Sequence, residues 1–286
     1  MARLNGPLKI TGSLGNLSFY NMIGVEHTIV REKGGATKED IEKKPQFEMT
    51  RLQNKEFRGR ATGSKFVMWA LDQHKTVANF NFAGPINALL KHIQDLDPVN
   101  NKGERSILLT QYPRLLEGFE FNRTHSFSAF VRHPLQYSVD TSTLTATIDI
   151  PELIPGINFI PQFELPYFRL LATLRLVPDI VYKESIARYD HINDEWPEWK
   201  SAETQTEWYP ISGGAPAIQL TLKSESTTIP EPSFIAVLAI SLQFGKPGPL
   251  GLINSVKYVG GGKILAVGSV PLPVGSSQSA VGSQLT

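Results

Sequence analysis

The chain has 286 residues, of which 41% are hydrophobic and 19% charged, a formal net charge of +1 and no cysteine. This composition is typical of a folded chain with enough apolar residues for a sizeable core. The lack of cysteine excludes disulfides, thiolate metal sites and cysteine nucleophiles. The nearly neutral charge argues against a protein whose whole surface attracts nucleic acid.

No segment of the sequence resembles a secretory signal or a membrane-spanning helix. Residues 1–21 lack an apolar central stretch, and the longest apolar run, residues 234–244, has about half the roughly 20 residues that a span needs. We therefore expect a protein without a membrane span that is cytoplasmic at synthesis. Unconventional export or lysis would still release it outside the cell.

The first part of the chain predicts a β-hairpin followed by two helices. Residues 8–20 and 27–31 have strand character, with turns at Gly12, Gly15 and Asn16. Residues 46–72 read as a helix, and a second helix runs from Pro85 to about residue 96. The first helix has an apolar face with helical spacing, made by Phe57, Ala61, Ser64, Met68 and Leu71.

After residue 118 the apolar period changes to two, which favours strands. The predicted strands are residues 127–131, 144–150, 167–177, 204–209, 217–223, 233–244, 255–259 and 263–270. Their spacing predicts a mainly β protein with a β-sandwich or jelly-roll-like domain after the hairpin and the two-helix segment. We expect domains at residues 1–118 and 119–270, followed by a flexible or extended tail at residues 271–286.

The first half of the chain contains several distinctive stretches: IxGxLGNLSFY from residue 10, VRxKGG from residue 30, TR at 50–51 with EF at 56–57, and LLxGFxFN from residue 115. Together they resemble a family of uncharacterised proteins common in Bacteroidetes genomes. The resemblance covers roughly residues 8–122. It implies no activity, and it assigns no catalytic residue to this chain.

Motifs for known chemistry are absent from the sequence. The six histidines form no pair with metal-ligand spacing, and there is no G-x-S-x-G nucleophile elbow. The run from Gly260 to Lys263 lacks the spacing of a phosphate-binding loop, and a turn between two strands is the better interpretation. We predict no enzyme activity, no cofactor and no nucleic-acid partner.

One acidic loop is a weak candidate for a metal site. Oxygen-rich loops bind Ca²⁺, and the carboxylates here belong to Asp190, Asp194, Glu195 and Glu198. The nearby Trp196 and Trp199 make a sugar site or a docking surface alternative interpretations. A solvated loop is the interpretation that we favour, since no EF-hand order is present.

A basic stripe on the first long helix is the candidate interface. It comprises Arg51, Lys55, Arg58 and Lys65. Residues 1–75 carry 13 Lys/Arg and 8 Asp/Glu, a net charge of +5, whereas the remainder carries 15 and 19, a net charge of −4. Such polarity suits head-to-tail contacts between copies, although a solvated helix face is the simpler interpretation of the stripe alone.

The sequence favours a structural, self-associating protein that forms homo-oligomers, rings or filaments. The alternative is a β-sandwich binding module for carbohydrate or another extracellular ligand, with Trp196, Trp199, Trp208 and Tyr209 as platforms. An enzyme is the third hypothesis, with Asp194 and Glu198 as a carboxylate pair for hydrolysis.

Overall fold

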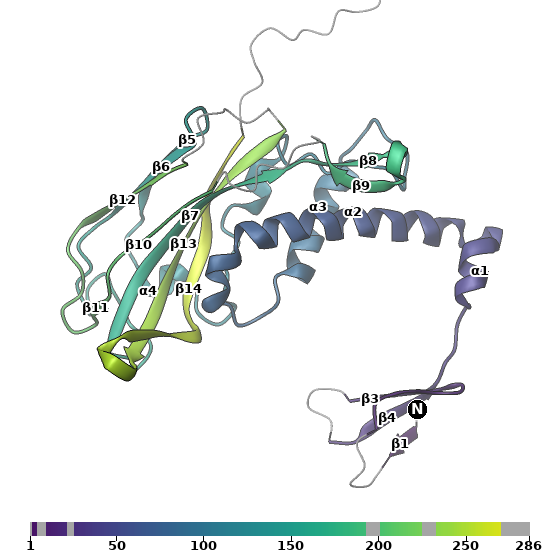
Figure 1. Ribbon diagram of the computed structural model, residues 1–286, viewed down its shortest axis with the longest axis horizontal. Helices are drawn as coiled ribbons and strands as arrows, with labels where there is room; N and C mark the ends of the chain where they lie inside the picture. Colours follow the sequence, from purple (N-terminus) through teal and green to yellow (C-terminus); the bar gives the residue numbers. More distant parts are fainter. Residues whose placement is uncertain (1, 5–9, 22–25, 193–200, 225–232, 270–286) are drawn as a thin grey trace, which may run out of the picture. The chain divides into compact units, whose positions relative to one another are not determined.

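The computed structural model describes residues 2–4, 10–21, 26–192, 201–224 and 233–269, and it divides into compact units at residues 1–52 and 53–286 (Figure 1). Of the described residues, more lie in strands (39%) than in helices (26%), which confirms the mainly β prediction. The boundary between the units lies at residue 52, whereas the sequence analysis placed one at residue 118. The helices between these positions pack onto the strands that follow, so they share a core with the sandwich.

The first unit contains a four-stranded antiparallel sheet with the order β1-β4-β3-β2. Its strands are β1 (Ala2–Leu4), β2 (Gly12–Leu14), β3 (Leu17–Tyr20) and β4 (Thr28–Glu32). The predicted hairpin is β2–β3, and its turn uses Gly15 with a φ of +54°. Helix α1 (Lys38–Lys43) follows, and Thr37 and Asp40 form the capping box at its start. A 3-10 turn, η1 (Pro45–Phe47), leads into the next helix.

The two predicted helices are α2 (Glu48–Ala70) and α3 (Ala83–Asp95), with the 3-10 turn η2 (Asp72–Thr76) between them. The predicted apolar face of the first helix was partly wrong, because Phe57 is 53% exposed. The buried face instead carries Gly59, Gly63, Val67 and Ala70. A Cβ at Gly59 would lie 2.7 Å from Tyr189 Cδ1, so only a residue without a side chain fits this close contact.

The second unit is built on a central antiparallel sheet with the order β10-β7-β13-β14, and β11 also pairs with β7. These strands are β7 (Tyr167–Pro178), β10 (Ser201–Gln205), β11 (Tyr209–Pro210), β13 (Phe234–Pro247) and β14 (Ile253–Ser269). A second sheet has the order β12-β6-β5. It is made by β5 (Gln136–Asp140), β6 (Thr145–Ile150) and β12 (Ile218–Lys223).

The central sheet is covered on both faces, so its middle strands are largely apolar, with buried polar residues such as Thr173 and Ser241 among them. Even-numbered residues of β7 and β13, from Phe168 and Phe234 onward, belong to the core between the two sheets. Odd-numbered residues such as Val177, Ile235 and Val237 belong to the core shared with the helices. Successive side chains of a strand point to opposite faces, so these strands read as continuous hydrophobic runs.

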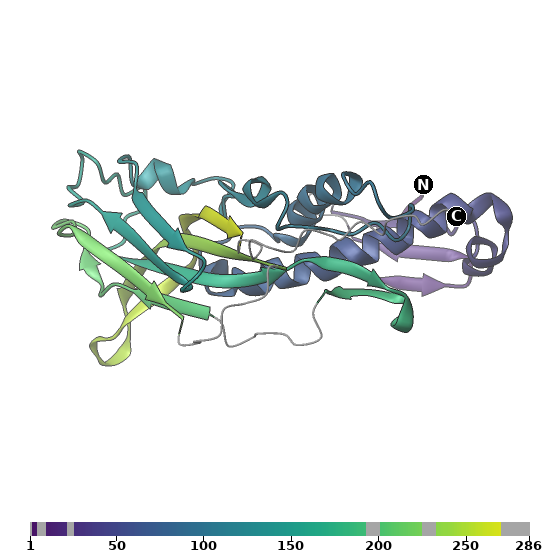
Figure 2. The same ribbon diagram turned by 90° about the horizontal axis from the view of Figure 1, so that it is seen from above.

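A small hairpin continues from the end of β7. It consists of β8 (Ile180–Lys183), the 3-10 turn η4 (Glu184–Ile186) and β9 (Arg188–His191). In the turned view this hairpin extends beyond the central sheet beside α2 (Figure 2), in agreement with the contact between Gly59 and Tyr189.

Two local predictions for the second unit were wrong. Residues 127–131, expected as a strand, begin with the short helix α4 (Phe127–Phe130), and the expected turn at Gly260–Gly262 lies inside one long strand, β14. The glycines permit close packing there, because a Cβ at Gly262 would lie 2.7 Å from Ile240 O. The segment before α4 covers this strand, with Phe121 donating its N–H to Gly262 O at 2.7 Å. Two further 3-10 turns are η3 (Pro113–Leu116) and η5 (Pro249–Gly251).

Candidate functional site

The sheet of the first unit exposes one mostly apolar face, on which the charged Glu32 lies opposite Leu17. Strand pairing places four apolar side chains on the same side, across three strands. We name this surface the apolar N-terminal face, and it consists of Leu14, Leu17, Phe19 and Val30. Leu14 is 72% exposed and Leu17 is 40% exposed, while Phe19 and Val30 are half-buried.

The first unit has little interior to stabilise that sheet. Among its residues whose burial the structure describes, from residue 10 onward, only Thr28 and Ile29 are buried. Strand β2 is an outer strand of the sheet and is exposed at all three residues. An isolated small sheet needs a packed hydrophobic face to be stable, and an outer strand offers unpaired backbone groups to another chain. The exposed apolar side chains and the unpaired edge of β2 are both features of a docking site.

The four residues of the predicted basic stripe differ in their surroundings. Arg51 donates from Nη1 to the carbonyl oxygens of Ile41 and Lys44, which ties α1 to the start of α2. Lys55 forms an ion pair with Glu104 at 2.7 Å, and its ammonium lies 3.6 Å from the centre of the Tyr182 ring. Arg58 and Lys65 are exposed. Arg58 and Lys65 are thus accessible to another molecule, while Arg51 and Lys55 interact with other residues of the chain.

Most of the predicted acidic loop lies outside the described residues. This holds for Asp194, Glu195 and Glu198, and for the tryptophans Trp196 and Trp199. Asp190 is described, and it lies on β9 beside His191. No group of three or more His, Cys, Asp or Glu side chains that could hold a metal occurs within the part of the chain that the structure describes. The other two predicted aromatic platforms are half-buried, with Trp208 under Arg169 and Tyr209 against Phe168.

A network of polar side chains joins the helical layer to the central sheet. His74, in η2, lies 2.9 Å from Ser241 Oγ through Nδ1 and 2.8 Å from Thr173 Oγ1 through Nε2. Burial, with a smaller effect of the Arg175 charge, lowers the pKa of His74 from 6.5 to about 3. His74 and Ser241 are fully buried, so neither side chain can reach a substrate. The network is a neutral internal contact.

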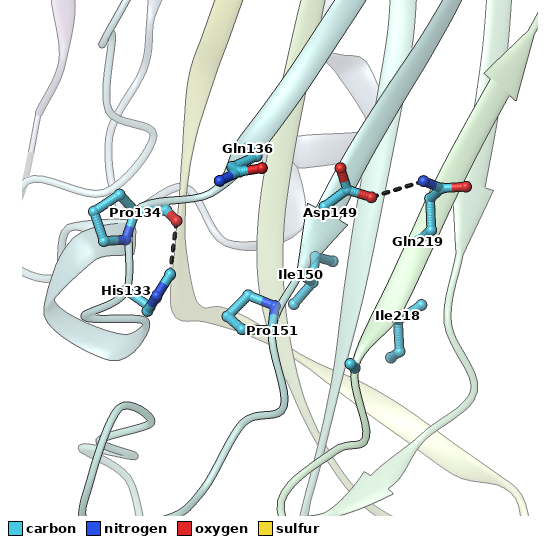
Figure 3. Close-up of a pocket in the computed structure, with 9 residues that line it drawn as sticks. His133, Pro134, Gln136, Asp149, Ile150, Pro151, Ile218 and Gln219 are labelled. Carbon is cyan, nitrogen blue, oxygen red and sulfur yellow. Dashed lines mark hydrogen bonds between the residues drawn. The ribbon is translucent and has the colours of Figure 1, made fainter.

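A shallow hollow of about 410 Å³ lies on the outer side of the β12-β6-β5 sheet (Figure 3). Gln136, Asp149 and Gln219 come from three adjacent strands in direct register, and Gln219 donates to Asp149 at 2.7 Å. His133 Nδ1 lies 2.8 Å from the carbonyl oxygen of Pro134. Because a carbonyl can only accept, Nδ1 carries the proton of this contact, which leaves Nε2 for a ligand. We name this site the outer hollow.

A second cavity, of about 480 Å³, lies on the other side of the same segment. We name it the edge cleft, and its lining includes Phe127, Ser128, Val131, Arg132, Leu135, Tyr137, Lys263 and Leu265. Successive side chains of a strand point to opposite faces, which explains why this segment borders both cavities. Leu135 and Tyr137 line the edge cleft, whereas Gln136 lines the outer hollow. His133 and Pro134 line both cavities, so the two are neighbours.

Sequence reasoning did not single out the residues of these cavities. Alternation in residues 136–140 and 144–150 indicates which side chains face solvent, so Gln136 and Asp149 could be placed on an outer face. Their alignment with Gln219 could not be predicted, because it depends on strand pairing across 70 residues. The presence of Arg132 and Lys263 in the same cleft likewise depends on tertiary structure.

Comparisons with known proteins identify no relative. No protein-family model matches the chain, no curated protein matches it, and no solved structure matches its fold. The resemblance to a Bacteroidetes family therefore stays a prediction. Among the described residues, no helix combines the length and the apolar character needed to cross a lipid bilayer.

Proposed function

We propose that the chain is a non-enzymatic structural subunit that assembles with copies of itself through the sheet of its first unit. The observation that carries this proposal is the exposure of Leu14 and Leu17 on a small sheet with almost no interior. Burying one leucine side chain contributes about 1.5–3 kcal/mol. Association itself costs about 4–15 kcal/mol, so the apolar N-terminal face needs added backbone pairing to hold a second chain.

The segment that supplies this pairing is residues 270–274 of a second copy, with the sequence Val-Pro-Leu-Pro-Val. It lies outside the described residues and follows directly after β14. In an extended strand, N–H groups of alternate residues point the same way. Val270, Leu272 and Val274 can therefore pair with the free side of β2, while Pro271 and Pro273 face outward, where no N–H is required.

The same alternation suits the side chains. Val270, Leu272 and Val274 share one face of such a strand and would extend the apolar N-terminal face beyond Leu14. The exposed cations Arg58 and Lys65 can orient approaching copies, but exposed ion pairs contribute only about 0–1 kcal/mol each. Because a sheet and a tail are different surfaces, their contact is heterologous and produces rings or filaments.

Light scattering at high micromolar concentration and low salt tests the proposal. The wild-type chain is expected to form oligomers, and deletion of residues 271–286 to shift the distribution toward monomer. Leu272→Pro removes one inward N–H and should have the same effect, whereas Pro273→Ala changes only the outward side and should not. Leu14→Ser should weaken assembly, and Leu252→Ser is the matched control, since Leu252 is 66% exposed in the second unit.

Two results would contradict the proposal. A wild-type chain that remains monomeric under these conditions refutes self-assembly itself. Oligomers that persist unchanged in Leu272→Pro, or that respond equally to Leu14→Ser and Leu252→Ser, refute the assigned contact.

A further inference from the structure

We infer that the edge cleft and the outer hollow together bind an acidic saccharide, in which a carboxylate-bearing sugar is linked to a neutral one. The inference concerns the second unit alone and is independent of self-assembly. Each cavity, at about 480 and 410 Å³, has a volume within the roughly 300–1,000 Å³ typical of ligand pockets.

The edge cleft favours an anion. Arg132 and Lys263 both line it, and no aspartate or glutamate belongs to its lining. Lys263 Nζ lies 3.2 Å from Ser128 Oγ, so a hydroxyl stands beside the ammonium. The carboxylate of Glu120, which is paired with Lys263 in a β-bridge, accepts the Phe127 N–H at 3.1 Å; burial raises its pKa, and the Lys263 charge acts in the opposite direction. A bound carboxylate would thus meet two cations and a hydroxyl donor.

The cleft also contains an apolar platform of the kind that a sugar ring needs. Tyr137 is 45% exposed, and the buried Phe127, Val131 and Leu265 also line the cleft. A tyrosine combines an apolar ring face with a polar hydroxyl. The C–H face of a sugar can pack on that ring, while its carboxylate reaches the cations. A small inorganic anion would leave this apolar area uncovered.

The outer hollow favours neutral hydroxyl groups. Gln136, Asp149 and Gln219 offer amide donors and amide and carboxylate acceptors within one row, and the imidazole of His133 lies to one side of that row (Figure 3). A sugar hydroxyl both donates and accepts, so neighbouring hydroxyls can satisfy such a mixed row. Asp149 disfavours a second carboxylate here. The charge difference between the cavities therefore selects an acidic sugar on one side of His133–Pro134 and a neutral one on the other.

Isothermal titration calorimetry with a short mixed oligosaccharide, containing galacturonate and galactose, tests the inference. The counterpart in which the carboxyl groups are reduced to alcohols serves as the neutral probe. The acidic probe is expected to bind more tightly than the neutral one. Arg132→Ala and Tyr137→Ala should each weaken its binding by about tenfold. Lys223→Ala is the matched control, since it also removes one exposed cation, but from the far end of β12.

Sulfate separates a sugar site from a simple anion site. Gln219→Ala should weaken binding of the oligosaccharide and leave binding of sulfate unchanged, because Gln219 lines only the outer hollow. Equal effects of Arg132→Ala and Lys223→Ala would show attraction by net charge alone and overturn the inference. Equal binding of the acidic and neutral probes, no tighter binding of the oligosaccharide than of sulfate, or no binding by the folded wild-type chain would overturn it as well.

Discussion

His74 joins the helical layer to the central sheet through two hydrogen bonds made inside the core. Its ring accepts one hydrogen and donates another when neutral, and Ser241 and Thr173 can take the complementary roles. Protonation would place a charge in a fully buried position near Arg175. The polar contact is therefore stable only while the imidazole is neutral, which makes stability depend on pH.

We predict that His74 makes the second unit less stable in acid. Its pKa of about 3 in the folded chain is below the ordinary 6.5, so the unfolded state binds the proton more readily. The contribution of neutral His74 is complete above pH 6.5 and is lost as the pH falls toward 3, by on the order of 5 kcal/mol at the acid limit. Urea unfolding of wild type and His74→Gln across this range measures the difference.

Asp179 changes the stability of the second unit with pH in the opposite direction, so its effect must be separated from that of His74. Burial raises the pKa of Asp179 to about 6, despite hydrogen bonds from Thr110. Its contribution to the free energy of unfolding therefore increases as the pH falls from 6 toward 3.8. Subtracting the His74→Gln curve from the wild-type curve cancels this effect. An unchanged pH dependence in His74→Gln, or a His74 ring resonance that titrates near pH 6.5 in the folded chain, would contradict the prediction.

At the scale of elements, glycines decide how closely α2 approaches its neighbours. Gly59 faces the Tyr189 ring and Gly63 faces the side chain of Leu90. The Tyr189 hydroxyl in turn donates to backbone carbonyl oxygens, with Oη 3.0 Å from Gly103 O and 3.2 Å from Arg105 O. The bidentate pair of Glu56 with Arg105 binds the same loop to α2. Packing of this helix thus depends on its glycines, which have no side chain, as much as on its apolar residues.

We predict opposite effects of alanine at two helical glycines. Gly59→Ala should lower the free energy of unfolding by about 1–3 kcal/mol, because its Cβ would overlap the Tyr189 ring. Gly84→Ala, in α3, meets no atom within 4 Å and should raise it by about 0.4–1 kcal/mol. Thermal unfolding of both variants checks this. Stabilisation by both substitutions would mean that α2 can move away from Tyr189 at little cost.

At the scale of the whole molecule, the two hydrophobic cores belong entirely to the second unit. The core between the sheets starts at Phe127, and the core under the helices starts at Val67. The largest fully buried side chains of the described residues thus lie beyond residue 52. Folding of the sandwich should therefore not depend on the first unit, to which we assign the proposed assembly.

We predict that deletion of residues 1–36 leaves the unfolding transition of the second unit within about 3 °C of the wild-type temperature. The deletion keeps Thr37, the cap of α1, and both cores. Differential scanning calorimetry measures the transition, and light scattering should show loss of assembly in the same sample. Deletion of residues 1–75 is the contrasting control, since it removes α2 and uncovers one face of the sheet. Loss of cooperative unfolding in the shorter deletion would contradict the separation.

The sequence by itself determined the secondary structure of the central strands and the presence of the helices. Alternating or continuous apolar residues on β6, β7 and β13 report burial directly, because the side-chain period of a strand is fixed by local geometry. The hairpin at Gly15 and the cap at Thr37 were equally local, since their hydrogen bonds join residues close in sequence.

Tertiary structure alone decided which face of α2 is buried, the continuity of β14 and the position of both cavities. Phe57 is 53% exposed, whereas Gly59, two residues further on, packs against the Tyr189 ring. The glycines of β14 resemble a turn in sequence, yet they lie in a strand because Phe121 and Ile240 press against it. Arg132 and Lys263 line one cleft although 131 positions separate them in the sequence. Such contacts depend on packing between distant segments, and no local pattern records them.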